Sequence, residues 1–113
     1  MDETPGWVNE VRLVGRVSAA AEERELPSGD QVAQLRVVVP RSSTAGGGAR
    51  VDTIDVACWS PRTRRSARGL RPDDHVEVVG ALRRRFFRAG TATVSRYEVE
   101  AGAIKRIRTK AGG

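Results

Sequence analysis

The sequence predicts an all-β domain in which five strands close into a small barrel, with one short helix between the third and fourth strands. Apolar residues alternate with polar ones along most of the chain, which indicates strands and not amphipathic helices. Glycines interrupt two of these alternating runs, as at the bends of a barrel. The 113 residues are enough for one modest core, so a single domain is expected.

The first two strands are expected over residues 8–17 and 31–39, joined as a hairpin through the turn-forming segment 26–30. Gly15 interrupts the inward positions of the first strand and predicts a bulge or a close approach of another backbone. The side chains predicted to face the core are Val11, Leu13 and Val17, then Ala33, Leu35, Val37 and Val39. The opposite faces carry Arg12, Val14 and Arg16, then Arg36 and Val38.

A third strand is expected over residues 51–59, after a Ser- and Gly-rich segment, 42–49, that predicts a mobile loop. Ile54, Val56 and Cys58 share one parity and should face the core, whereas Thr53, Asp55, Ala57 and Trp59 should face outward. Ser60 is a suitable N-cap and Pro61 a suitable first residue for the single helix, which is predicted to extend to about residue 70.

The fourth strand is expected from about residue 75, with Gly80 as a second bend, and the fifth from about residue 93 towards residue 107. The core positions predicted in the fourth strand are Val76, Val78, Leu82 and Phe86, and the outward positions are Arg83, Arg85 and Phe87. Five short strands with glycine bends and a helix between the third and fourth are typical of the five-stranded OB-fold barrel.

The charge of the chain is positive and unevenly distributed. Residues 31–113 carry 17 basic and 7 acidic side chains, within a total net charge of +6. This excess of positive charge indicates a polyanionic partner. No apolar run is long enough to span a membrane and the acidic first residues do not resemble a signal peptide, so a cytoplasmic protein is expected. Residues 1–6 are predicted to be a disordered N-terminus, 7–107 the domain, and 108–113 a short basic tail.

Catalysis and metal binding are not expected. Cys58 and His75 are the only residues of their types, so neither a disulfide nor a Cys/His metal cluster can form within the chain. Asp52 and Asp55 are three apart on a strand and therefore face opposite sides, which prevents them from acting as a carboxylate pair. The sequence therefore predicts a non-enzyme without a cofactor or a metal.

Aromatic rings beside arginines on consecutive strands are suited to stacking unpaired bases while neutralising phosphates. If the outward faces form one groove, the residues predicted to contact a single strand are Trp59, Phe87, Thr53, Arg12, Arg16, Arg36, Arg83 and Arg85. Two alternatives remain open at this point: Trp59 could pack under the helix, and the arginines at 83–85 could be a solvated strand edge that prevents aggregation.

Several segments together resemble the bacterial single-stranded DNA-binding protein family. They are residues 8–17 (VNEVRLVGRV), 27–29 before 32–37, 55–59 (DVACW) before the helix, and 76–83 (VEVVGALR) after it. The resemblance covers about residues 8–107. It implies an OB fold, sequence-independent binding of single-stranded DNA in replication, recombination or repair at the nucleoid, and a homotetramer, with a dimer as the alternative. It also implies stacking roles for Trp59 and Phe87.

This chain departs from the family pattern in three places. Thr53 stands where many members have another stacking aromatic, and residues 40–50 contain no aromatic. The chain also stops without the acidic tip that recruits repair enzymes, which is expected of a truncated form or of a short, specialised paralogue. Two other functions therefore remain open, an OB-fold protein-interaction module of the primosomal type and a binder of single-stranded RNA.

Overall fold

The structure is a computed structural model that describes residues 6–41 and 50–108. Its elements are β1 (Val11–Val17), β2 (Glu22–Glu25), β3 (Gln31–Pro40), β4 (Val51–Cys58), α1 (Pro61–Arg68), β5 (His75–Ala89) and β6 (Ala92–Arg106). The predicted mobile loop at 42–49 lies outside the described residues. So do all but one residue of the predicted disordered N-terminus, 1–6, and all but one of the predicted basic tail, 108–113. The division of the chain into an N-terminus (1–6), a domain (7–107) and a tail (108–113) remains a prediction.

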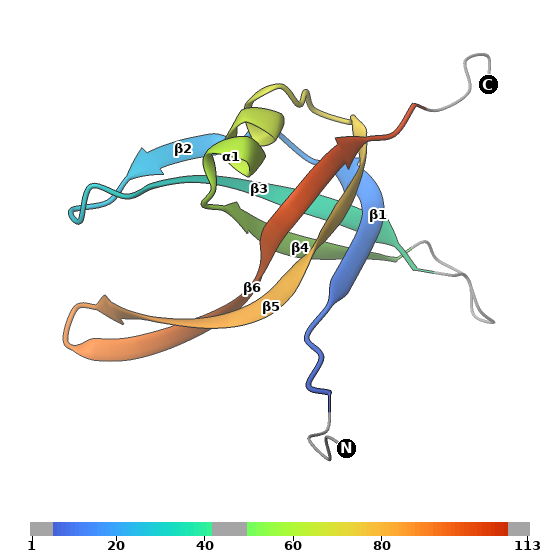
Figure 1. Ribbon diagram of the computed structural model, residues 1–113. Coiled ribbons are helices and arrows are strands. Elements are labelled where there is room, and N and C mark those ends of the chain that lie inside the picture. Colours follow the sequence, from blue (N-terminus) through green and yellow to red (C-terminus); the bar gives the residue numbers. More distant parts are fainter. Residues whose placement is uncertain (1–5, 42–49, 109–113) are drawn as a thin grey trace, which may run out of the picture.

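Five strands form a closed ring in the order β1, β5, β6, β4, β3, and β3 pairs again with β1 (Figure 1). All pairings in this ring are antiparallel except the short one between β4 and β6. The helix α1 lies at one end of the ring (Figure 1). The prediction of a five-stranded OB-fold barrel with one helix between the third and fourth of its strands is confirmed. No helix in the described part of the chain is long and apolar enough to cross a bilayer.

Two glycines allow the ring to close, as the sequence predicted. At Gly15 a Cβ atom would lie 2.3 Å from the carbonyl oxygen of Val38, where β1 reaches β3. At Gly80 a Cβ atom would lie 2.0 Å from the carbonyl oxygen of Glu100, beside a register shift between β5 and β6. Both positions therefore require a residue without a side chain.

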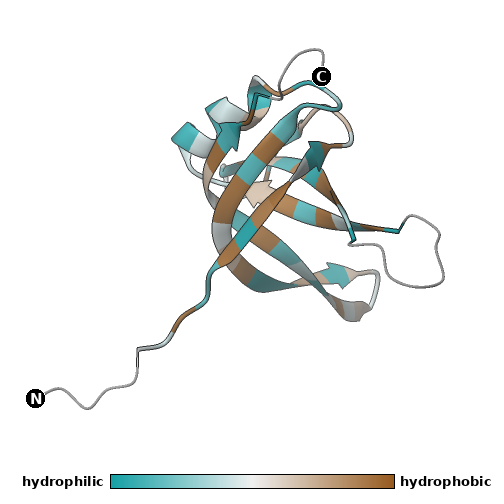
Figure 2. Ribbon diagram, turned by 90° about the vertical axis from the view of Figure 1, so that its right-hand side faces the viewer, coloured by the Kyte–Doolittle hydropathy of each residue, from teal (hydrophilic) through white to brown (hydrophobic). Residues whose placement is uncertain are grey.

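The core follows the predicted alternation of apolar residues, which Figure 2 shows as hydrophobic and hydrophilic bands along the strands. Ala67 of α1 and Leu70, which follows the helix, also belong to this core. The buried cluster consists of Val17, Ala33, Leu35, Val37, Val56, Cys58, Ala67, Leu70, Val76, Val78, Val99 and Ala101. Ser60 caps α1 as predicted, because its side chain accepts a hydrogen bond from the Thr63 amide at 3.1 Å.

The strand β2 was not predicted, and the connection of the first two expected strands was wrong. The turn at residues 26–30 joins β2 to β3, and β1 meets β3 only at Arg16 and Val17. All four residues of β2 are exposed. The strand pairs with β3 through its backbone and buries no alternating apolar side chain, so it leaves no periodic signal in the sequence.

Four burial predictions were also wrong. Phe86 and Leu82, both expected in the core, are 63% and 45% exposed, because the β5–β6 hairpin projects away from the barrel beyond this point (Figure 1). Val38 and Ala57, expected on an exposed face, are 5% and 1% exposed. Each lies on the outer face of the sheet between two paired strands, Val38 between Arg16 and Thr53 and Ala57 between Gln34 and Glu100.

The only cysteine should be chemically inert in the folded protein. Cys58 is fully buried, and its desolvation raises the pKa of the thiol to about 12. Since the thiolate is the reactive form, we expect no labelling by an aromatic disulfide reagent at pH 8 in the native state and complete labelling in urea. The same shift makes folding less favourable as the pH rises above the ordinary value of 9.0, because the unfolded thiol ionises first. Equal labelling rates with and without urea would contradict the burial.

Candidate nucleic-acid interface

Two hairpins, β2–β3 and β5–β6, project from the same side of the barrel (Figure 1). Side chains of both hairpins line a groove of about 370 Å³, which we call the aromatic groove. Trp59, which directly follows β4, also lines the groove. The lining residues are Arg24, Leu26, Val32, Gln34, Trp59, Arg85, Phe86, Phe87, Arg96 and Glu98. The groove thus brings together three of the residues predicted from the sequence, Trp59, Arg85 and Phe87.

Trp59 is positioned by the boundary between β4 and α1. It follows the last residue of β4 and precedes the N-cap Ser60, and its carbonyl oxygen accepts a hydrogen bond from Arg64 Nε at 3.3 Å. The side chain is half-buried, and its indole Nε1 is buried without a hydrogen-bond partner among the described residues. The ring therefore lines the groove and is not enclosed beneath the helix.

Arg85 covers the ring of Trp59. The guanidinium carbon lies 4.2 Å from the ring centroid, within the range of a cation–π interaction. Arg85 Nε also donates to Glu98 Oε2 at 2.5 Å, and the Glu98 side chain is only 5% exposed. A buried carboxylate needs such a partner, so Glu98 fixes the position of Arg85 beside Trp59.

Phe87 presents a second ring next to this pair. It is 43% exposed, and the guanidinium carbon of Arg96 lies 5.5 Å from its centroid. Arg85 and Arg96 are directly paired across β5 and β6, so both guanidinium groups lie on the same face of the hairpin. Phe86 also lines the groove, with the guanidinium carbon of Arg84 4.8 Å from its centroid. The aromatic groove therefore holds three aromatic rings, each beside an arginine.

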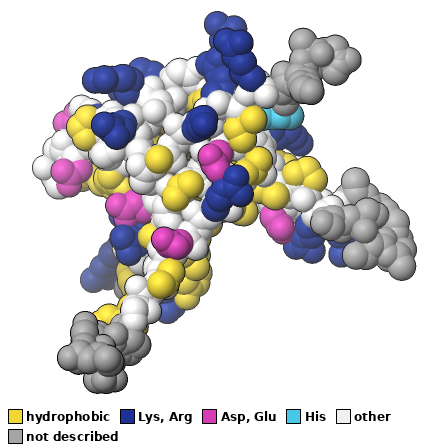
Figure 3. All heavy atoms as spheres, turned by 45° about the vertical axis from the view of Figure 1, so that its right-hand side comes forward, with side chains coloured by type: hydrophobic (Ala, Val, Ile, Leu, Met, Phe, Trp, Pro, Cys, Tyr) yellow, Lys and Arg dark blue, Asp and Glu magenta, His cyan; other side chains and the backbone are white. Residues whose placement is uncertain are grey.

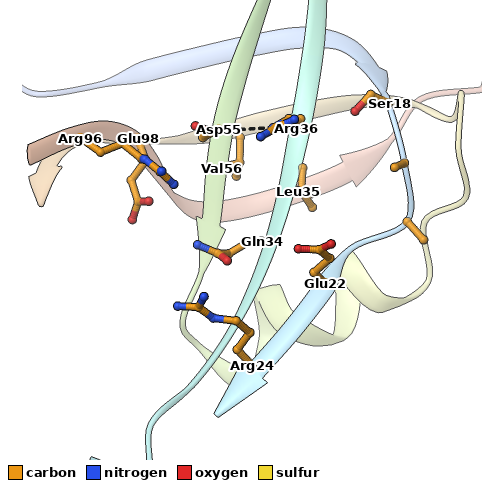
Figure 4. Close-up of a pocket in the computed structure, with 12 residues that line it drawn as sticks. Ser18, Glu22, Arg24, Gln34, Leu35, Arg36, Asp55, Val56, Arg96 and Glu98 are labelled. Atoms are coloured by element: carbon orange, nitrogen blue, oxygen red, sulfur yellow. Dashed lines mark hydrogen bonds and ion pairs between the residues drawn. The ribbon is translucent and has the colours of Figure 1, made fainter. Parts of the chain in front are cut away.

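A second groove of about 360 Å³ continues from the first and shares Arg24, Gln34, Arg96 and Glu98 with it. Figure 4 shows this polar groove, in which Arg36 and Asp55 pair at 3.1 Å. Three arginines and three carboxylates line it, the latter being Glu22, Asp55 and Glu98. The aromatic groove has three arginines and a single carboxylate, so it is the more favourable of the two for a polyanion.

The other predicted contact residues lie outside both grooves, except Arg36. Each of the remaining arginines pairs with a carboxylate: Arg12 with Glu77, Arg16 with Asp73 at 3.4 Å, and Arg83 with Glu100 at 2.9 Å. Thr53 is exposed on the outer face of β4, opposite Val38. Strand parity correctly places these four residues on exposed positions, but the outer face curves around the barrel and does not form one groove.

The sequence reasoning missed seven lining residues of the aromatic groove: Arg24, Leu26, Val32, Gln34, Phe86, Arg96 and Glu98. Arg24 lies on β2, the strand without a periodic signal, and Gln34 lies opposite Ala57 on the outer face of β3. Arg96 pairs directly with Arg85, so the correct register of the last hairpin would have identified it.

The geometry agrees with comparisons to known proteins. A model of the single-strand binding protein family matches residues 8–107. The chain belongs to this family. Proteins of the family bind single-stranded DNA without catalysing a reaction, and this is the function class of the chain. Comparison with curated proteins gave no match.

The fold of the family is also found among solved structures. The structure of Plasmodium falciparum SSB in complex with single-stranded DNA matches with a TM-score of 0.77 and 18% sequence identity. The match covers 96% of this chain and 100% of the other. At this identity the similarity establishes a shared fold and leaves the contact residues to be argued from the groove itself.

Proposed function

We propose that the protein binds single-stranded DNA in the aromatic groove, with bases stacked on Trp59 and Phe87 and phosphates held by Arg24, Arg85 and Arg96. The observation that carries this proposal is the meeting of both rings and three arginines in one groove with a single carboxylate. Stacking contributes about 1–3 kcal/mol per base whatever the base is, so the binding is independent of sequence. Such a protein covers and protects exposed strands in replication, recombination or repair, in the cytoplasm at the nucleoid.

Arg85 has two roles in this proposal. In the free protein its guanidinium lies over the Trp59 ring and pairs with Glu98. A base that stacks on the same side of the ring takes the place of the guanidinium, which then reaches a phosphate of the strand. The guanidinium of Arg85 thus covers the Trp59 ring in the free protein. It pairs with Glu98 in the free protein and with a phosphate in the complex.

The remaining predicted residues extend the path of the strand beyond the groove. Arg36 and Arg83 lie on strands next to it and supply further phosphate contacts. Arg12, Arg16 and Thr53 lie further around the barrel and contact a strand long enough to wrap that far. Their arginines exchange a carboxylate partner for a phosphate, so each contributes less than an unpaired arginine does.

We further propose that the protein is a homo-oligomer, a tetramer with a dimer as the alternative. Trp7 and Val8 are 87% and 76% exposed just before β1, and Val14 and Val79 are 43% and 42% exposed on the outer face of β1 and β5. Figure 3 shows one side of the molecule, where hydrophobic side chains lie between basic and acidic ones. Contact between copies would cover such residues. Sedimentation should give four times the mass of one chain for a tetramer, or twice that mass for a dimer. Val14→Asp should lower the measured mass.

The salt dependence of binding tests the phosphate contacts. For single-stranded DNA the logarithm of the binding constant falls with the logarithm of salt concentration by about 0.7 per phosphate contacted. We expect Arg96→Ala to weaken binding of oligo-dT and to reduce this slope by about that amount. Arg62→Ala, on the exposed surface of α1, is the matched control and should leave the slope unchanged.

Two results would contradict the proposal. Binding that is undetectable at moderate salt, together with a stoichiometric protein partner, would instead identify an interaction module. Tighter binding of an RNA oligomer than of its DNA counterpart would identify RNA as the ligand. Equal competition by the two would show only that the groove does not select deoxyribose.

A further inference from the structure

Glu98 places a negative charge inside the groove that we propose for a polyanion. It is the single carboxylate among the residues that line the aromatic groove, and it also lines the polar groove. Its side chain is 5% exposed, whereas the carboxylates of the other ion pairs in the described part of the chain are at least 23% exposed. A carboxylate at this position opposes the binding of a phosphate.

Arg85 neutralises Glu98 in the free protein. Its Nε donates to Glu98 Oε2 at 2.5 Å while its guanidinium carbon lies 4.2 Å from the centroid of the Trp59 ring. Because Glu98 is buried, removal of Arg85 leaves its charge without a partner and without full hydration, which is costly. The carboxylate therefore holds Arg85 over the ring more firmly than a cation–π contact alone does.

The other arginines of the aromatic groove have no such carboxylate. Arg24 and Arg96 form no salt bridge with any described residue. A phosphate that binds either of them releases counterions to the solution, whereas a phosphate that binds Arg85 must first displace Glu98. The groove thus combines two arginines that are open to phosphate with one that exchanges a carboxylate for it.

We infer that Glu98 is an internal competitor of the DNA phosphate, which holds Arg85 on Trp59 and so lowers the affinity of the groove for a strand. This inference rests on the proposed function, in which a base replaces Arg85 on the ring. Each binding event then breaks the pair of Arg85 and Glu98, and each release restores it. Glu98 acts through Arg85 and is a positioning residue, and the groove releases a strand more readily than three unpaired arginines would.

The test replaces Glu98 with glutamine, which keeps the shape of the side chain and removes its charge. Glu98→Gln should bind oligo-dT about tenfold more tightly than the wild type, because the hydrogen bond that opposes binding is no longer to a carboxylate. The dependence of binding on salt should steepen by about 0.7, since the contact of Arg85 with a phosphate now releases a counterion. Glu25→Gln makes the same charge change on exposed β2, lines neither groove and should keep the wild-type affinity and slope.

Two further measurements check that the effect passes through Arg85. The Arg85→Ala/Glu98→Gln double variant should return to the wild-type salt slope, because the arginine that gains a counterion is gone; a slope as steep as that of Glu98→Gln would overturn the inference. In free protein that carries Trp7→Phe, acrylamide should quench Trp59 more efficiently when Glu98→Gln is added, because Arg85 covers the ring less firmly. Unchanged quenching would contradict the holding of Arg85 by Glu98.

The outcomes separate this inference from the proposed function. If the wild type does not bind oligo-dT, the proposed function fails. If the wild type binds and Glu98→Gln binds equally or more weakly, the proposed function stands and Glu98 is not a competitor. Should Glu98→Gln fail to fold, Arg85→Ala is compared with Arg96→Ala: only Arg96→Ala should reduce the salt slope, and an equal reduction in both would overturn the inference.

Discussion

Replacing Trp59 with alanine should weaken the binding of oligo-dT by about 1–3 kcal/mol, which corresponds to roughly 5- to 150-fold in the dissociation constant. The expected loss is large because the ring forms one wall of the aromatic groove and holds Arg85 in place at 4.2 Å. The measurement is a fluorescence anisotropy titration with labelled oligo-dT at fixed salt concentration. Trp59→Phe keeps an aromatic surface and should recover most of the affinity.

Trp7 supplies the matched control for this substitution. It is 87% exposed before β1 and lines neither groove, so Trp7→Ala should leave the affinity for DNA unchanged. If Trp59→Ala binds as tightly as Trp7→Ala and the wild type, then Trp59 has a structural role only and the strand takes a different path.

Replacing Gly80 with alanine should have the largest effect on stability. The new Cβ atom would lie 2.0 Å from the carbonyl oxygen of Glu100 and 3.1 Å from the Cα atom of Ala101, so the β5–β6 pairing must shift to accept it. Overpacking of this kind costs about 1–3 kcal/mol, and more when backbone atoms are the obstacle. The midpoint of urea unfolding should fall accordingly.

Gly102 offers a control at the same irregularity of the sheet. The nearest atom to a Cβ there is the carbonyl oxygen of Val79 at 3.5 Å, an ordinary contact, and Gly102→Ala should unfold near the wild-type midpoint. Equal midpoints for Gly80→Ala and Gly102→Ala would show that the close approach at Gly80 does not limit the stability of the barrel.

The barrel could be predicted because its strands bury one face against a common core. In β3 and β4 this produces alternation with a period of two, and Leu35, Val37 and Val56 were correctly predicted to lie in the core. The same reasoning cannot find β2, whose four residues are polar and exposed and bury no alternating apolar side chain. It also fails at Phe86, since alternation predicts a buried face only where the sheet has something to cover.

The candidate site could be predicted only in part. Parity correctly placed Trp59, Arg85 and Phe87 on outward faces, and the structure joins them in one groove. It could not show which outward positions lie on the same side of a closed barrel, so Arg12 and Arg16 were grouped with residues from which the curvature separates them. Arg24 and Arg96 depend on a strand and a register that were not known from the sequence.

The most direct test of base stacking on Trp59 uses this ring as the only tryptophan reporter. Trp7→Phe leaves Trp59 as the single tryptophan of the chain, inside the aromatic groove. On titration with oligo-dT, its emission should be quenched in a saturable manner, with the same midpoint and stoichiometry as the anisotropy of labelled DNA. DNA binding by anisotropy without any change in Trp59 emission would contradict stacking at this ring.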